Sequence, residues 1–309
     1  MSASVPTTPV DPPSSADPRP LMLHREILLA TDASPAALAA TRVAGALARR
    51  WVMTPHVCTV VPPPPMAFDP VGANIVYAPG LEREIRQEIE HQVEASAGES
   101  SCWPHETAVG SPAAEIVRLA EAHGSDLIVL GLRAHAFLDR MFRDETALSV
   151  MRHASVPVLA VTPLTAGLPR RIAVAIDFSR ASIAAARAAL TLLDDDGALM
   201  LVYVEPPAEP RAPETEGYTT IYAQGLAAAF TRLRQELAAR TKARIETVVL
   251  HGATAPELLS FAKRAEVDLI AVGSQRHSIA RRAVVGSVTT ALARAASCSL
   301  FVIPPSHHA

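Results

Sequence analysis

Two stretches of this chain are nearly the same: residues 113–131 are AAEIVRLAEAHGSDLIVLG, and residues 255–273 are APELLSFAKRAEVDLIAVG. Near the start of each half, LLATDAS at 28–34 is matched by VAIDFS at 174–179. Solenoid and propeller repeats are units of about 20–50 residues, far shorter than the spacing between these copies. The sequence therefore predicts a duplicated domain. The longer copies align at an offset of 142 residues, which pairs Glu115 with Glu257, Asp126 with Asp268, and Gly131 with Gly273.

Length and composition agree with two folded domains. The chain has 309 residues, of which 49% are hydrophobic and 19% charged, and a domain typically has about 150 residues. The repeat places the domains at residues 23–163 and 171–305, with a linker at 164–170. Residues 1–22 are rich in proline and lack the cationic start and apolar stretch of a signal peptide. We expect them to form a disordered tail.

Charge, hydropathy and cysteine content exclude several classes of partner. The net charge of -3 gives no sign of nucleic-acid binding, and no run approaches the roughly 18 apolar residues of a membrane span. Three cysteines form no CxxC pair, and their odd number argues against a disulfide framework, so we expect a cytoplasmic protein. His24, His56, His91 and His105 show no ligand spacing, so no metal site is expected.

Short apolar runs alternate with helical patterns in both halves. Strands are expected at 26–31, 57–61, 107–109, 126–130 and 156–161, and again at 172–176, 198–204, 245–250, 269–272 and 299–303. Helices are expected between them, and this alternation predicts an α/β fold. We expect two tandem doubly wound domains, each with a five-stranded, mainly parallel sheet. Ligands bind such sheets beyond the carboxyl ends of the strands, so the residues after the first and fourth strands are the candidate site.

The loop after the fourth strand of the second half has a particular spacing. Gly273-Ser-Gln-Arg276 is followed by nine residues and then by Gly286-Ser287-Val288. This pattern resembles the nucleotide-binding signature of the universal stress protein family: Gly, two residues, Gly, nine residues, Gly, then Ser or Thr. The resemblance extends over both halves, because the order of elements and the aspartate that ends the first strand also match. It implies the family's fold, which is that of the adenine nucleotide alpha hydrolase-like proteins.

By this resemblance, the second domain binds ATP, with or without Mg²⁺. The physical properties of the loop agree, because glycine lets a backbone approach a phosphate and reach positive φ, and the start of a helix attracts anions. Arg276 replaces the signature's second glycine, and it either pairs with a phosphate or obstructs the pocket. The family pattern places Ala175 and Val204 at adenine, Asp177 and Gly273 at the ribose, and Arg276, Gly286, Ser287 and Val288 near the phosphates.

The first half keeps the spacing of this loop but not its chemistry. Gly131-Leu-Arg-Ala134 is followed by nine residues and then by Asp144-Glu145. Carboxylates suit the start of a helix in an empty protein, but they repel an arriving triphosphate. We therefore expect that the first domain does not bind ATP. Its degenerate site comprises Asp32, Val60, Gly131, Asp144 and Glu145.

No catalytic apparatus is evident in the sequence, which contains neither a GxxxxGK[ST] loop nor a GxSxG elbow. We expect a stress-response factor that binds ATP through its second domain and acts by binding an unidentified protein partner, with at most slow, incidental hydrolysis. The alternative is an interaction or scaffold module of the same family that binds no nucleotide. An adenylate-forming or pyrophosphatase relative is disfavoured, because Asp32-Ala-Ser-Pro and Asp177-Phe-Ser-Arg stand where a glycine/serine-rich phosphate loop is needed.

The last strand of each half is an apolar edge candidate. Single-domain relatives commonly dimerise through this strand, so 156–161 and 299–303 are expected to pair within one chain as a pseudo-dimer. An uncovered apolar edge favours association, so a homodimer of two such chains is a further expectation.

Overall fold

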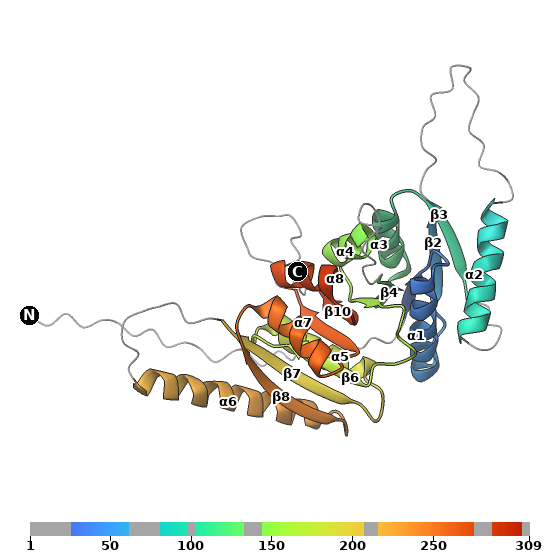
Figure 1. Ribbon diagram of the computed structural model, residues 1–309. Coiled ribbons are helices and arrows are strands. Elements are labelled where there is room, and N and C mark those ends of the chain that lie inside the picture. The colour runs from blue at the N-terminus through green and yellow to red at the C-terminus, as the bar shows by residue number, and fades with distance from the viewer. Residues whose placement is uncertain are drawn as a thin grey trace, which may run out of the picture.

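A computed structural model of the chain describes residues 26–61, 81–97, 103–132, 144–206, 216–274 and 286–304 (Figure 1). The two halves have the same order of elements. The first comprises β1 (Ile27–Ala30), α1 (Pro35–Trp51), β2 (His56–Val61), α2 (Leu81–Ala97), β3 (His105–Val109), α3 (Pro112–His123), β4 (Leu127–Gly131), α4 (Asp144–His153) and β5 (Val158–Val161). The second comprises β6 (Arg171–Ala175), α5 (Arg180–Leu192), β7 (Ala198–Glu205), α6 (Glu216–Ala238), β8 (Arg244–His251), α7 (Thr254–Arg264), β9 (Leu269–Gly273), α8 (Ser287–Ala295) and β10 (Ser299–Ile303).

The strands form one ten-stranded sheet in the order β3-β2-β1-β4-β5-β10-β9-β6-β7-β8. Each half contributes five strands with the same internal order, and every pairing within a half is parallel. The halves meet where β5 pairs with β10 in antiparallel register, with Leu159 opposite Phe301. The expected α/β fold with two tandem, mainly parallel domains is therefore confirmed, and the two five-stranded sheets are continuous with each other.

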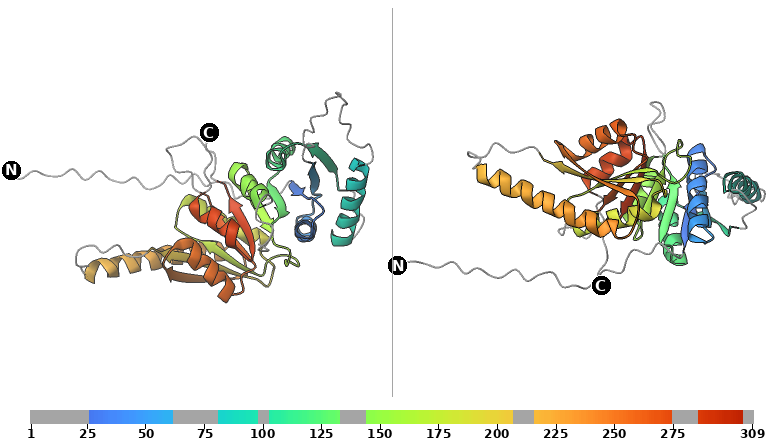
Figure 2. Two further views of the ribbon diagram at one scale, coloured as in Figure 1. Left: turned by 45° about the horizontal axis from the view of Figure 1, so that its top comes forward. Right: turned by 90° about the horizontal axis from the view of Figure 1, so that it is seen from below.

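Side-chain alternation along the strands explains how helices cover both faces of the sheet. In β7, Leu199 and Leu201 pack into one core, and Met200 and Val202 pack into the other. The first core is covered by α1, α2, α5 and α6, and the second by α3, α4, α7 and α8. Two further views show α2 and α6 at opposite ends of the molecule (Figure 2). No helix among the described residues has the length and apolar character needed to cross a membrane.

Serine caps set the start of the helix that follows the first strand of each half. The Ser34 Oγ accepts the N–H of Ala37 at 3.4 Å, and Pro35 occupies the first turn of α1. The Ser179 Oγ accepts the N–H of Ser182 at 3.2 Å at the start of α5. A serine at this position satisfies a backbone donor that has no partner within the helix. The same local chemistry thus orients both helices against the sheet.

The contact between the halves is apolar along the strands and polar at its margins. The hydroxyls of Thr165 and Ser299 lie 2.9 Å apart, and the N–H of Thr162 donates to the Ser299 Oγ at 3.2 Å. At another point, the Arg50 guanidinium pairs with the Asp195 carboxylate at 2.6 Å. Because β5 and β10 each cover the other's edge, separating the halves exposes two apolar strands. Each half therefore depends on the other to cover its apolar edge strand.

Phe301→Ala removes a fully buried ring, which is 0% exposed, from the strand that joins the halves. We expect the free energy of unfolding to fall by about 3–5 kcal/mol, because the truncation loses apolar burial and leaves a cavity. Chemical denaturation of the full chain measures this change. The control Leu164→Ala alters a residue that is 90% exposed, so a change within about 0.5 kcal/mol is expected. Equal effects of the two substitutions would contradict the proposed importance of this core.

Candidate functional site

The candidate site lies where the strand order changes direction in the second half. β6 has β7 on one side and β9 on the other, so the connections that leave β6 and β9 diverge. Such a point forms a crevice at the carboxyl edge of a parallel sheet. Because α8 links the parallel strands β9 and β10, it must run back across the sheet. Its amino terminus therefore lies at this same carboxyl edge.

Asp177 organises the turn between β6 and α5. Its Oδ1 accepts the N–H of Ser179 at 2.9 Å, and its own N–H donates to the Ser182 Oγ at 3.3 Å. Burial acts to raise the pKa of the Asp177 carboxyl, but hydrogen bonds from Ser179 and Ser182 and from backbone N–H groups outweigh it and lower the pKa. The carboxylate is thus ionised at neutral pH and shapes the turn. Its role at a ribose stays a prediction.

The residues expected to flank adenine lie on one face of the sheet. Ala175 and Val204 are on neighbouring parallel strands, and both pack with the core covered by α7 and α8. Val288, from the first turn of α8, packs against the same core. The structure therefore places these three apolar side chains in one layer. Such an apolar layer is suited to the face of a planar ring, and the role of these residues at adenine stays a prediction.

Gly273 is required by close packing. A Cβ built at Gly273 would lie 2.3 Å from the backbone carbonyl carbon and oxygen of Ala181 and 2.7 Å from the backbone nitrogen of Ser182. No real Cβ is found so close to backbone atoms, so a side chain here would displace the start of α5. The structure gives Gly273 a steric role, and its predicted contact with a ribose is untested.

No described residue covers the start of α8. Gly286 precedes the helix with φ −54° and ψ 154°, and none of the described side chains caps the first turn. A Cβ built at Gly286 would meet no heavy atom of the described residues within 4 Å, and the Ser287 side chain is exposed. Gly286 therefore does not have the positive φ that was expected of a glycine. The space that a glycine leaves for a ligand is present among the described residues. Unpaired N–H groups at such a helix start favour an anion. Arg276 lies outside the described residues.

The first half repeats the turn but replaces the helix start. The Asp32 Oδ1 accepts the N–H of Ser34 at 3.0 Å. Ala33, between them, has a φ of 59°, and the equivalent Phe178 of the second half has the same φ. Val60 packs against the same layer as Val204. β4 ends at Gly131, and the backbone places Asp144 and Glu145 in the first turn of α4. The side chains of these two acidic residues are outside the described part, so their effect on a nucleotide stays a prediction.

A cavity that the sequence did not predict lies on the other face of the sheet. It has a volume of about 320 Å³ and is lined by aromatic rings, the Asp177 carboxylate and the early part of α6. The Tyr203 and Tyr222 hydroxyls lie 2.7 Å apart, and this hydrogen bond, with burial and the Glu205 charge, raises the pKa of Tyr222 to about 12. Tyr203 faces the opposite side of β7 from Val204, so this cavity and the predicted adenine layer are distinct.

Comparisons with known proteins agree with this architecture. The universal stress protein family matches the chain twice, over residues 24–162 and 169–304. The chain is 31% identical over 140 residues to the universal stress protein MJ0531 of Methanocaldococcus jannaschii, which is 45% of this chain and 82% of that protein. The chain therefore belongs to the universal stress protein family, with two domains in tandem.

Solved structures show the same fold at low sequence identity. A universal stress protein from Archaeoglobus fulgidus aligns with a TM-score of 0.63 and 18% identity, over 90% of this chain and 98% of that one. A functionally unknown protein, PA1789 of Pseudomonas aeruginosa, aligns with a TM-score of 0.56 and 14% identity, over 93% of this chain and 94% of that one. Both matches span nearly the whole of each chain, so the fold is shared with these proteins.

Gly273→Ala and Gly286→Ala form a matched pair that separates a packing glycine from an open one. We expect Gly273→Ala to lower the free energy of unfolding by about 1–3 kcal/mol or more, because the added methyl group collides with α5. For Gly286→Ala we expect less than about 1 kcal/mol, because the methyl group enters open space at an ordinary φ. Denaturant titration of each full-length variant measures both values. Similar losses would show that the close approach at Gly273 is incorrect.

Asp177→Asn keeps the shape of the turn but removes its charge. Because the pKa of Asp177 is below its ordinary value of 3.8 in the folded chain, its stabilising contribution is present above that pH and is lost as the pH falls through the folded pKa. The difference in unfolding free energy between wild type and variant should therefore be larger at about pH 7 than at about pH 3. Denaturation at both pH values measures it. A difference that grows on acidification would show that the shift has the opposite sign.

Proposed function

We propose that the second domain binds an adenine nucleotide, ATP, at the carboxyl edge of β6, β7 and β9. The observation that carries this proposal is the start of α8, which no described side chain caps or covers, at the same edge as the layer formed by Ala175 and Val204. The apolar layer suits the adenine face, and the helix start suits the phosphates. In this proposal the ionised carboxylate of Asp177, which also lines the cavity next to Tyr203 and Tyr222, accepts hydrogen bonds from ribose hydroxyls.

The first domain differs at the point where the phosphates would lie. Asp144 and Glu145 align with Gly286 and Ser287 at the 142-residue offset of the repeat. We infer that these two acidic residues supply the negative charge that the dipole at a helix start favours, and that they repel a phosphate. We infer that one nucleotide binds per chain. We also propose that Mg²⁺ accompanies the nucleotide without a separate protein site.

We further propose that the protein signals by binding rather than by turnover. In this account ATP changes the surface that a protein partner recognises in the cytoplasm, and hydrolysis is slow and incidental. The fifth strands are paired within the chain, so a homodimer must use a surface other than β5 and β10. The alternative is a scaffold that binds no nucleotide. In that case the second domain, like the first, has no working nucleotide site.

Nucleotide titration of wild type and Gly286→Asp tests the proposal. This substitution copies Asp144 from the first half into the second. Isothermal titration calorimetry with ATP and Mg²⁺ should give one site per wild-type chain. We expect the variant to bind at least about tenfold more weakly, a loss of about 1.4 kcal/mol, because a carboxylate faces the phosphates. Bound ATP should also raise the melting temperature of the wild type, since it binds only the folded chain.

Gly286→Ala is the matched control, because it adds a side chain without a charge. It should bind ATP within about threefold of the wild type, which corresponds to less than about 0.7 kcal/mol. Two sites per chain would contradict the inferred exclusion from the first domain. Equal affinities of Gly286→Asp and wild type would mean that ATP lies elsewhere, and no binding at all would favour the scaffold.

A further inference from the structure

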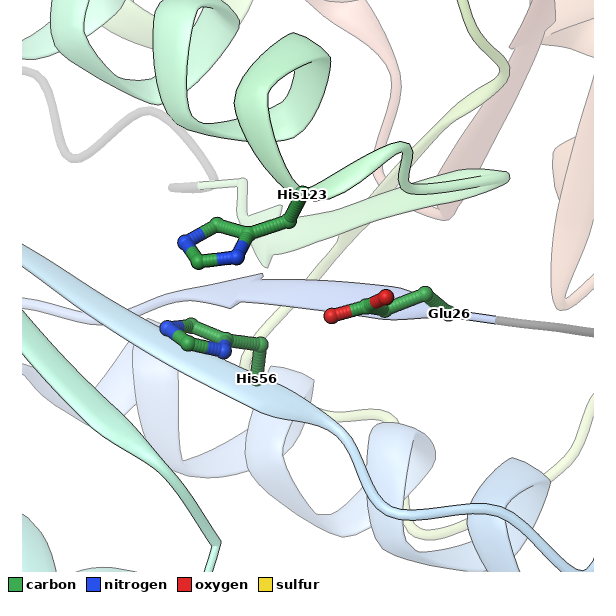
Figure 3. A group of neighbouring side chains, drawn as sticks. All are labelled: Glu26, His56 and His123. Atoms are coloured by element: carbon green, nitrogen blue, oxygen red, sulfur yellow. The ribbon is translucent and has the colours of Figure 1, made fainter.

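The first half contains a group of polar side chains at the amino edge of the sheet, opposite the edge discussed above. Glu26 directly precedes β1, His56 begins β2, and His123 ends α3. In Figure 3 the Glu26 carboxylate points toward the two imidazole rings. One potential ligand atom from each of the three residues lies within 4.8 Å of the others. The spacing of histidines along the chain did not indicate this group, because its three members come from separate parts of the fold.

The two imidazoles are held face to face beside a second carboxylate. The rings of His56 and His123 have centroids 3.8 Å apart at an interplanar angle of 31°. The His123 Nε2 lies 3.1 Å from the Glu106 Oε2, which is hydrogen-bonding distance. The His56 Nε2 is 3.9 Å from the same oxygen, and it is buried without a hydrogen-bond partner among the described residues. Both Nε2 atoms thus lie toward the Glu106 carboxylate, which leaves the two Nδ1 atoms for a ligand on the side of Glu26.

The second half shows that the fold does not need polar groups at these positions. The strand registers and the 142-residue offset align His56 with Met200, Glu106 with Val248 and His123 with Ala265. All three residues in the second half pack into the apolar core beneath α7. Arg171 aligns with Glu26 and is exposed. The ancestral scaffold thus accommodates an apolar layer here, and the first half alone places two imidazoles and two carboxylates in it.

Two imidazoles beside a carboxylate form a ligand set for a cation that approaches the edges of the rings, where the nitrogen lone pairs point. Ring nitrogens of both histidines and carboxylate oxygens of Glu26 and Glu106 gather at this point. Neutral imidazole is the form that coordinates metals. Two glutamates beside neutral rings carry a charge that one divalent cation balances. An acidic residue that accepts the second ring N–H of a ligating histidine is also a recurrent feature of metal sites.

We propose that Glu26, His56 and His123 bind a divalent transition-metal ion of the zinc type, with Glu106 orienting His123. A hydrogen bond from the His123 Nε2 to Glu106 leaves Nδ1 as the ligand atom. Ligands of a tetrahedral zinc ion at 2.0–2.1 Å are about 3.3 Å apart, so the ligand atoms, which lie within 4.8 Å of one another, move closer by side-chain rotation when the ion binds. A water molecule completes the coordination. Imidazole ligands favour zinc, cobalt and nickel over Mg²⁺ and Ca²⁺, which prefer oxygen.

Titration of the chelator-treated full-length protein with Co²⁺ tests this site, and zinc competition confirms its class. We expect one Co²⁺ per chain, with the intense visible d–d bands of tetrahedral coordination, displaced by Zn²⁺ but not by Mg²⁺. His56→Met and His123→Ala copy the second half and should preserve the fold. Each should weaken binding at least about 100-fold and abolish the bands, because a direct ligand is lost. Glu106→Gln should weaken it by about 10–100-fold, as expected for a group that positions a ligand.

His251→Ala is the matched control, because His251 is an exposed histidine of the second half that pairs with Glu205 at 3.1 Å. It should leave both the stoichiometry and the bands unchanged. Melting curves of all variants without metal establish that they fold, and Zn²⁺ should raise the melting temperature of wild type but not of His56→Met. Absence of tetrahedral bands in the wild type, or full binding by both His56→Met and His123→Ala, would overturn the proposal.

Discussion

The antiparallel pairing of β5 with β10 is the contact on which the structure depends. It joins two five-stranded sheets into one and buries the apolar edge that each domain would otherwise expose. Phe301 and Leu159 lie opposite each other across this contact, and both belong to a core that extends through both halves. The two domains are thereby held in one fixed relation. Each can change at its loops and edges while the other maintains the shared sheet.

Duplication makes the differences between the halves informative. The turns after β1 and β6 have the same hydrogen bond to an aspartate and a residue in the left-handed conformation at the same position. The turn at the carboxyl edge is therefore alike in both halves. The helices after the fourth strands differ: α8 starts with glycine and serine, and α4 starts with two acidic residues. At the amino edge, the second half is apolar and the first carries Glu26, His56 and His123. We infer that the domains have specialised at opposite edges, one for an anion and the other for a cation.

Local patterns were sufficient to predict the elements, because apolar periodicity and serine caps act over a few residues. The strand at 299–303, for example, has the bounds expected from the sequence. Contacts between distant segments were not accessible in this way. Gly273 is needed because α5, about ninety residues earlier, packs on it. The group at Glu26 gathers three separate parts of the fold, and matching His56 with Met200 required the strand registers of the structure. Tyr222 likewise reaches Tyr203 only through the placement of α6.

Amide hydrogen exchange of the intact chain, followed by mass spectrometry with and without ATP and Mg²⁺, compares the two helix starts within one molecule. The account predicts slower exchange across the first turn of α8, at residues 287–290, because phosphate oxygens accept those N–H groups. The first turn of α4, at residues 144–147, should exchange at the same rate in both conditions. Equal protection of both helices, or protection of α4 alone, would contradict the claim that the halves have diverged in what they bind.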